Sequence, residues 1–217
     1  MKGIIFDLDG TLANTLPLCV ATFQTVFLQL GGIRLDYDEV TALFGVTEEG
    51  IIKRVIGDKW RQGVRLYLEE YEKRHDQLRD LFPGVRELLD GLSEAGARLT
   101  MVTGKGRESA EISLCKFGLG DTFEIIEFGS PDKPIKPQGI KGVLDRWSLG
   151  PDDVAYVGDT PYDMEASGEV GVLGIGARWA ETSTLRGLRQ PHWPNVLFCE
   201  RPDEVLGLVK ASRLRKG

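Results

Sequence analysis

Two aspartates stand two residues apart where the first apolar run of the chain ends. The run covers residues 3 to 6, and Asp7 and Asp9 follow it. Residues two apart in an extended strand face the same way, so both carboxylates can point into one site. Ligands of open parallel sheets bind outside the carboxyl ends of the strands, where such a pair could act in catalysis. A lone pair of this kind is more often a solvated turn, so the interpretation needs further polar groups nearby.

A second apolar run, residues 99 to 102, leads into Thr103, Gly104 and Lys105. A helix-like stretch begins at Arg107. The free N–H groups of its first turn, the Thr103 hydroxyl and a glycine backbone would together form a phosphate cradle. The side chain of Thr103 could instead serve as the N-cap of this helix, and the two roles can coexist.

A third run, residues 154 to 157, ends in a loop that carries Asp159 and Asp163. This spacing lets one carboxylate reach a cation while the other supports it from the following helix. Oxygen ligands suit Mg²⁺, and the sequence shows no EF-hand spacing that would favour calcium. Lys136 precedes another helix-like stretch and could neutralise a nucleophilic carboxylate or a phosphoryl oxygen, although a single lysine is usually at the surface.

The elements that must position these groups alternate between strand-like and helix-like stretches. Strands are predicted at residues 3–6, 98–102, 154–157, 170–175 and 196–199, and helices at 85–95, 107–117, 139–147 and 202–209. Such alternation predicts the α/β class, with a Rossmann-like doubly wound parallel sheet whose strands are joined by helices.

One stretch of the chain interrupts this alternation. It shows helical patterns without a convincing strand, at residues 16–30, 38–44, 48–56 and 62–77. We therefore predict an α-helical cap domain at 14–80, inserted into an α/β core domain formed by 1–13 and 81–217. The chain passes between the two parts twice, and these two crossings would form a hinge.

Composition narrows the classes of partner. The chain has 217 residues, 33 acidic and 27 basic, and a formal net charge of -6 at pH 7, which gives no field that would gather nucleic acid or an anionic membrane. Cys19, Cys115 and Cys199 lack the spacing of a disulfide framework or a zinc site. With no leader-like or membrane-spanning segment in view, we expect a cytoplasmic protein, as a monomer or homodimer.

Four motifs in this order resemble those of the haloacid dehalogenase superfamily of aspartate-nucleophile phosphatases. They are Asp-Leu-Asp-Gly-Thr-Leu at 7–12, Val-Thr-Gly-Lys at 102–105, Lys-Pro at 136–137 and Gly-Asp-Thr-Pro-Tyr-Asp at 158–163. The resemblance covers nearly the whole chain. The helical insertion resembles the first cap type of that superfamily, as found in phosphoglycolate phosphatases, pyrophosphatases and β-phosphoglucomutases.

This resemblance implies a role for each matching residue. Asp7 would attack phosphorus to give an aspartyl phosphate, and Asp9 would protonate the leaving oxygen and later activate water. Thr103 and Lys136 would hold the phosphoryl oxygens. A Mg²⁺ cofactor would be bound by Asp7, the backbone carbonyl of Asp9 and Asp159, with support from Asp163. The candidate substrate-binding residues are Thr11, Gly104, Lys105, Arg107 and, in the cap, Arg54.

The sequence departs from the superfamily pattern at two places. Asn14-Thr15 stands where the superfamily often has an Asp-Ser or Asp-Thr pair. This difference weakens what the resemblance implies about the hinge and the substrate entrance, but not what it implies about the chemistry. Lys133-Pro134 lies three residues before Lys136-Pro137, so either lysine could be the one in the site. We prefer Lys136 because of its distance to the next helix.

The leading hypothesis is hydrolysis of a small phosphorylated metabolite, with phosphoglycolate as the closest named example. Inorganic pyrophosphate is an alternative, since residues 71–76 resemble cap sequences of family pyrophosphatases. A β-phosphoglucomutase-like phosphomutase is a third option. A non-catalytic phosphate-binding regulatory module on the same fold is the alternative from a different class. Dehalogenation is disfavoured because it needs neither the Asp9 acid nor a magnesium site, and phosphonate cleavage because the relative that performs it shows a different first motif.

Overall fold

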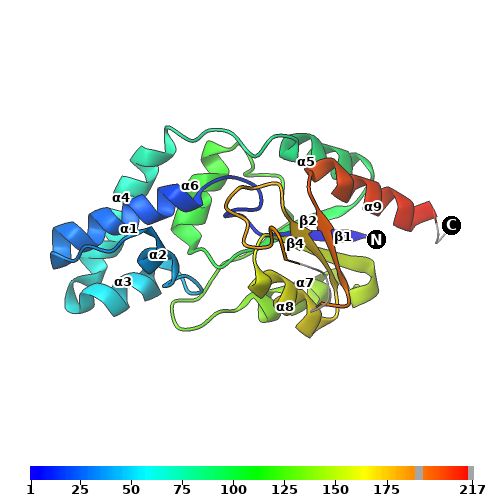
Figure 1. Cartoon of the computed structure of the whole chain (residues 1–217). Helices are drawn as coiled ribbons and strands as arrows, with labels where there is room; N and C mark the ends of the chain where they lie inside the picture. The colour runs from blue at the N-terminus through cyan, green and yellow to red at the C-terminus, as the bar shows by residue number, and fades with distance from the viewer. Residues whose placement is uncertain (189–192, 215–217) are drawn as a thin grey trace.

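A parallel sheet forms the centre of the protein (Figure 1). The computed structural model describes residues 1–188 and 193–214. Its strands are β1 (Gly3–Phe6), β2 (Arg98–Val102), β3 (Ile125–Glu127), β4 (Val154–Gly158), β5 (Leu173–Ala177) and β6 (Val196–Cys199). All neighbours pair in parallel, in the order β3-β2-β1-β4-β5-β6. Because β1 lies between β2 and β4, the loops that follow these three strands meet at one edge of the sheet.

Helices cover both faces of this sheet. They are α5 (Val85–Glu94), α6 (Arg107–Lys116), α7 (Lys136–Trp147), α8 (Pro161–Val170) and α9 (Pro202–Leu214), with a short 3₁₀ helix, η2 (Pro151–Asp153). The pairs α5–α9 and α7–α8 pack on opposite sides of the strands (Figure 1). Ile4 and Phe6 of β1 join the hydrophobic cluster on one face, and Ile5 joins the cluster on the other. The predicted doubly wound α/β fold is confirmed.

The helices α1 (Leu16–Gly31), α2 (Tyr37–Thr41), α3 (Glu48–Ile56) and α4 (Trp60–His75), with the 3₁₀ helix η1 (Gly57–Lys59), are called the cap helices here. They gather at one end of the molecule, beyond the sheet (Figure 1). Their apolar side chains, such as Phe23, Ile52 and Tyr67, form a hydrophobic cluster of their own. This separate cluster supports the domain division at residues 14 and 80, which stays a prediction.

The cap helices meet the core mainly through α4 and α6. At this contact the Ser113 hydroxyl lies 2.9 Å from the Tyr71 hydroxyl and 3.1 Å from Nε2 of His75, and all three side chains are buried. Within the described ranges, no helix is both long and apolar enough to cross a membrane. The cytoplasmic location and the oligomeric state stay predictions.

Several element boundaries differ from those predicted. The strand predicted at 170–175 is wrong at its start, because α8 continues to Val170 and ends on Gly171, whose φ of 86° is a left-handed C-cap. The helix predicted at 38–44 ends at Thr41. The sequence pattern missed β3, a strand of three half-buried residues at the edge of the sheet. Short, partly exposed strands lack the continuous apolar run that marks a central one.

Candidate active site

Three carboxylates and one ammonium group meet at the carboxyl ends of β1 and β4. Asp7 follows β1, Asp159 follows β4 and Asp163 lies in the first turn of α8, and ligand oxygens of the three lie within 4.8 Å of one another. The Lys136 Nζ is 2.7 Å from Asp7 Oδ2 and 2.5 Å from Asp163 Oδ1. All four residues are buried. One ammonium group cannot balance three carboxylates, so the site has an excess of negative charge.

The pKa values express this imbalance. Burial raises the pKa of Asp7 to about 6, although Lys136 opposes the shift. Burial, followed by repulsion from Asp163 and Asp7, raises the pKa of Asp159 well above its ordinary value. Burial would lower the pKa of Lys136, but the two carboxylates beside it raise that pKa well above its usual range. A further cation would therefore be stabilised among these groups.

One oxygen of Asp7 is available to a ligand. Among the residues that the structure describes, Asp7 Oδ1 is buried and has no hydrogen-bond partner. A buried carboxylate oxygen without a partner is costly unless a ligand or water satisfies it. The group of carboxylate oxygens around it is of the type that Mg²⁺ prefers. The site thus fits a hard divalent cation.

The other two carboxylates are held by hydrogen bonds from residues of neighbouring segments. Thr11 donates its hydroxyl to Asp159 Oδ1 at 3.0 Å. Thr160 caps α8, and its hydroxyl and N–H donate to Asp163 Oδ2 at 2.6 and 3.0 Å. The Tyr156 hydroxyl donates to Asp163 Oδ1 at 3.1 Å. Sequence reasoning missed Tyr156 and Thr160, although the Thr-x-x-Asp spacing of a capping box could have revealed Thr160.

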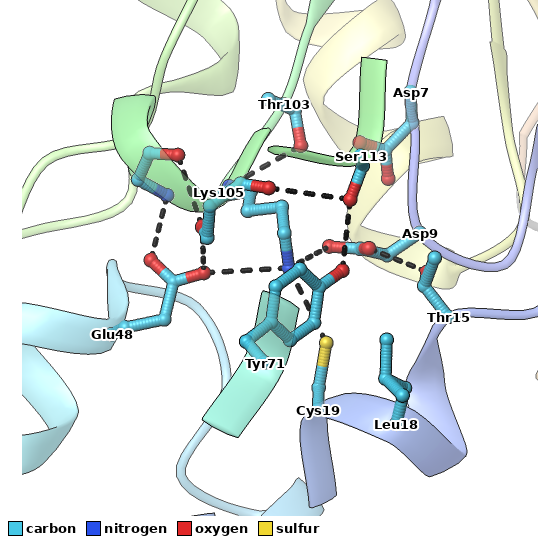
Figure 2. Close-up of polar contacts among 12 residues, drawn as sticks. Asp7, Asp9, Thr15, Leu18, Cys19, Glu48, Tyr71, Thr103, Lys105 and Ser113 are labelled. Carbon is cyan, nitrogen blue, oxygen red and sulfur yellow. Dashed lines mark hydrogen bonds and ion pairs between the residues drawn. The ribbon is translucent and has the colours of Figure 1, made fainter. Parts of the chain in front are cut away.

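Lys105 lies between the core and the cap helices (Figure 2). Its Nζ is 3.4 Å from Asp9 Oδ2 and 3.4 Å from Glu48 Oε1, and it donates to Cys19 Sγ at 3.3 Å. The Tyr71 ring centroid is 4.4 Å away. Burial would lower the pKa of this lysine, but Asp9 and other neighbours raise it well above its usual value. Lys105 is therefore a buried cation that two carboxylates neutralise.

Glu48 connects the cap to the start of α6. It lies in the first turn of α3, and its Oε2 accepts the Gly106 N–H at 2.8 Å while its Oε1 accepts the Ser109 hydroxyl at 2.5 Å. Gly106 is the N-cap residue of α6 and provides no side chain to cap it. A carboxylate from another helix thus satisfies a free N–H at this helix end. Sequence reasoning missed Glu48, since nothing in its local sequence distinguishes it from any acid in a first helical turn.

A cavity of about 420 Å³ lies between the cap helices and the carboxyl edge of the sheet. Its volume is within the range of about 300–1,000 Å³ typical of small-molecule sites. Six of the residues predicted for the site line it: Asp7, Asp9, Thr103, Gly104, Lys105 and Lys136. The sheet topology therefore brings residues from three distant segments to one cavity.

Comparison with known proteins identifies the family. The sequence matches the family described as haloacid dehalogenase-like hydrolase over residues 4–177, which is most of the chain. The chain belongs to this family. Its relatives include a phosphoglycolate phosphatase of Synechococcus elongatus, 30% identical over 181 residues that make up 82% of this chain and 84% of that protein. The pyrophosphatase PpaX of Bacillus velezensis is 27% identical over 208 residues, 95% of this chain and 92% of that protein.

The solved structures agree with this assignment. A haloacid dehalogenase-like hydrolase from Streptococcus pneumoniae is 26% identical, with a TM-score of 0.73, and the match covers 96% of this chain and 98% of that one. As a member of the haloacid dehalogenase-like hydrolase family, the protein is an enzyme of the hydrolase class. The resemblance inferred from the four motifs is confirmed.

The remaining residues predicted for this hydrolase lie outside the lining of the cavity. The exposed Arg107 side chain lies 3.5 Å from Glu111 and over the Phe128 ring, and Arg54 donates to the Asp132 carbonyl at 3.5 Å. Their predicted contacts with substrate stay predictions. Thr11 is fully buried beneath the cavity, where it holds Asp159.

The structure also separates the two candidate lysines of this hydrolase. Lys136 reaches Asp7, whereas Lys133 is exposed. Thr103, predicted as a helix cap or phosphate ligand, accepts the Lys105 N–H at 3.2 Å rather than an N–H of α6. Its hydroxyl is buried at the cavity wall and retains its own proton for donation to a ligand.

Substitution of Gly10 provides the first test of the site. Its φ is +78°, and a Cβ at this position would lie 2.4 Å from Asp159 Oδ2. Gly10→Ala is expected to lower the free energy of unfolding by about 1–2 kcal/mol through the left-handed backbone. It should also displace Asp159 and weaken Mg²⁺ binding, which calorimetric titration would measure.

Gly32→Ala provides the matched control. Gly32 has a φ of +67°, and nothing lies within 4 Å of its added Cβ. This variant should lose similar stability but bind Mg²⁺ as tightly as the parent. Equal Mg²⁺ affinity in the two variants would contradict the assignment of Asp159 to the cation site.

Proposed function

We propose that this hydrolase is a Mg²⁺-dependent phosphatase that cleaves a small phosphorylated metabolite through an aspartyl phosphate on Asp7. The observation that carries the proposal is the state of the Asp7 carboxylate. It is buried at the cavity wall, paired with Lys136 through one oxygen and without a hydrogen-bond partner at the other among the described residues. The names of the phosphatase and pyrophosphatase relatives support the same reaction class.

In the first half of the reaction, the Asp7 carboxylate attacks phosphorus and the bond from phosphorus to the ester oxygen breaks. The nucleophile and the phosphoryl group are both anionic, and at ~4 Å a pair of unit charges repels by about 4 kcal/mol at an effective dielectric of ~20. The positive charge of Lys136 lowers this repulsion. Asp9 gives its proton to the departing alkoxide, so an alcohol leaves. Thr103 and Lys136 would hold the phosphoryl oxygens.

In the second half, Asp9 takes a proton from water as the water oxygen attacks phosphorus. The bond from phosphorus to the Asp7 oxygen breaks, which releases phosphate and restores the carboxylate. Asp9 is held for both transfers by the Thr15 hydroxyl at 2.5 Å and by Lys105 Nζ at 3.4 Å. Its carboxylate thus reaches the cavity from a fixed position.

Asp7, the backbone carbonyl of Asp9 and Asp159 would hold Mg²⁺, with Asp163 in support. When bound, the ion supplies positive charge that offsets the nucleophile and the phosphoryl oxygens. The unpartnered Asp7 oxygen and the raised pKa values of Asp7 and Asp159 are what this assignment explains.

An assay of phosphate release tests this function. The substrates are phosphoglycolate, pyrophosphate, glucose 1-phosphate and a simple alkyl phosphate, each with Mg²⁺ or with EDTA. EDTA is expected to lower the rate about 100-fold or more, and added Mg²⁺ should restore it. Conversion of glucose 1-phosphate to an isomer without phosphate release would instead indicate a phosphomutase. Phosphate binding with no turnover of any substrate would indicate a regulatory module.

A further inference from the structure

The cavity holds positive charge only where that charge is already neutralised. Of the residues that line it in the described part of the chain, two are basic, Lys105 and Lys136. Lys136 is paired with Asp7 and Asp163, and Lys105 is paired with Asp9 and Glu48. Three lining residues are acidic: Asp7, Asp9 and Glu48. A group that enters beyond the phosphoryl position therefore meets no excess of positive charge.

The wall around this space is mainly apolar. It includes Leu16, Phe23, Phe44, Val46, Ile51 and Ile135. An anionic group placed against such side chains loses its hydration and gains no partner from them, and the cost is several-fold larger than for a neutral polar group. The hydroxyls in the lining, such as that of Tyr67, offer only neutral donors. An uncharged alkyl or aromatic group loses far less hydration free energy, and burial of its apolar surface is favourable.

We propose that the substrate is a phosphomonoester whose alcohol portion is uncharged and partly apolar, and that Glu48 enforces this choice by neutralising Lys105. The inference rests on the phosphatase activity proposed above. Without Glu48, Lys105 would face Asp9 alone and could attract a second anionic group of a substrate. The Glu48 carboxylate is fixed by Gly106 and Ser109, so it cannot turn away from the lysine without losing two hydrogen bonds.

Two compounds suggested by the relatives then become poor substrates. Phosphoglycolate carries a carboxylate and pyrophosphate a second phosphoryl group, and either would be placed beside Glu48 and the apolar wall. The chemistry at Asp7 is the same for all these substrates. Discrimination therefore depends on the cap side of the cavity.

A matched pair of substrates isolates the charge of the leaving group. Phosphoglycolate and phosphoglycolamide differ by a carboxylate and its neutral amide of nearly the same size. The parent enzyme with Mg²⁺ is expected to show a kcat/KM roughly tenfold or more higher for the amide. Glu48→Gln keeps an acceptor for Ser109 but removes the charge, so the ratio of the two kcat/KM values should fall roughly tenfold.

Glu49→Gln is the matched control. Glu49 is the next residue of α3, and its exposed carboxylate lies 3.4 Å from Lys53, outside the cavity lining. It removes the same charge, and the ratio should stay at the parent value. Because both substrates are compared on one enzyme sample, partial loss of folded protein cancels from the ratio.

The outcomes distinguish this inference from the function on which it rests. A parent enzyme that prefers phosphoglycolate to its amide overturns the inference while it supports the phosphatase. A ratio that does not respond to Glu48→Gln overturns the role of Glu48. Absence of phosphate release from every phosphomonoester, with Mg²⁺ present, overturns the proposed function itself.

Discussion

Asp7→Asn is expected to abolish phosphate release while the fold stays intact. The asparagine amide has nearly the same shape as the carboxylate but lacks the charge and nucleophilicity needed to attack phosphorus. A loss of about 10⁴-fold or more in kcat is the scale on which removal of a nucleophile acts. Phosphate release under saturating substrate and Mg²⁺ measures it.

Stability provides the control for this variant. The raised pKa of Asp7, about 6, means that the folded state resists ionisation of this group at neutral pH. Removal of the carboxylate should therefore leave the urea midpoint at pH 8 unchanged or higher. Loss of activity with a retained midpoint assigns the effect to chemistry. Turnover by Asp7→Asn at the rate of the parent would remove the whole mechanism.

Lys136→Met is expected to cause the largest loss of stability. The change leaves the buried carboxylates of Asp7 and Asp163 without the cation that lies 2.7 and 2.5 Å from them. Breaking a buried pair by removal of one partner costs about 3–5 kcal/mol. Urea denaturation in EDTA, at pH 8, measures the difference in free energy of unfolding.

The pH dependence of this loss follows from the pKa of Asp7. That pKa is already raised by burial to about 6, and loss of Lys136 raises it further. A folded state that holds protons more tightly than the unfolded chain gains stability as the pH falls. The deficit of Lys136→Met should thus be largest well above pH ~6, shrink as the pH falls toward ~6, and change little below that, where Asp7 is protonated in both folded proteins.

Lys133→Met is the matched control for this second test. Lys133 is three residues earlier and exposed, so its removal should change the free energy of unfolding by less than about 0.5 kcal/mol. A deficit that is equal in the two variants, or that does not change with pH, would contradict the role of the Lys136 pair.

The acidic site could be predicted because its residues occupy topological positions. Asp7, Thr103 and Asp159 each follow a buried apolar strand, and parallel strands bring their carboxyl ends to one edge whatever their separation in the chain. Lys136 is 129 residues from Asp7, yet its place at the start of α7 suffices to bring it to the same edge. For these residues, the order of strands and helices along the chain is enough to predict that their side chains meet at one edge of the sheet.

The cap side of the cavity could not be predicted in the same way. The contact of Glu48 with Lys105 and Gly106 depends on where the first turn of α3 lies relative to the start of α6, which no local pattern encodes. An acidic residue in the first turn of a helix is common because the helix dipole stabilises it there, so its presence does not predict a contact with another helix. Arg54 shows the converse, because its charge suggested a substrate contact but its helix face points it toward the Asp132 carbonyl.

The contact of α4 with α6 bears on how the cap is held against the core. Ser113 joins it to the core through a single hydroxyl that lies within hydrogen-bond distance of both Tyr71 and His75. A hydroxyl rotates freely about its bond and both donates and accepts. The same hydroxyl also donates to the Ser109 carbonyl at 3.2 Å, so one buried oxygen joins two side chains of α4 to the backbone of α6. The cap is therefore joined to the core at two places, by neutral hydrogen bonds at Ser113 and by the charged carboxylate of Glu48.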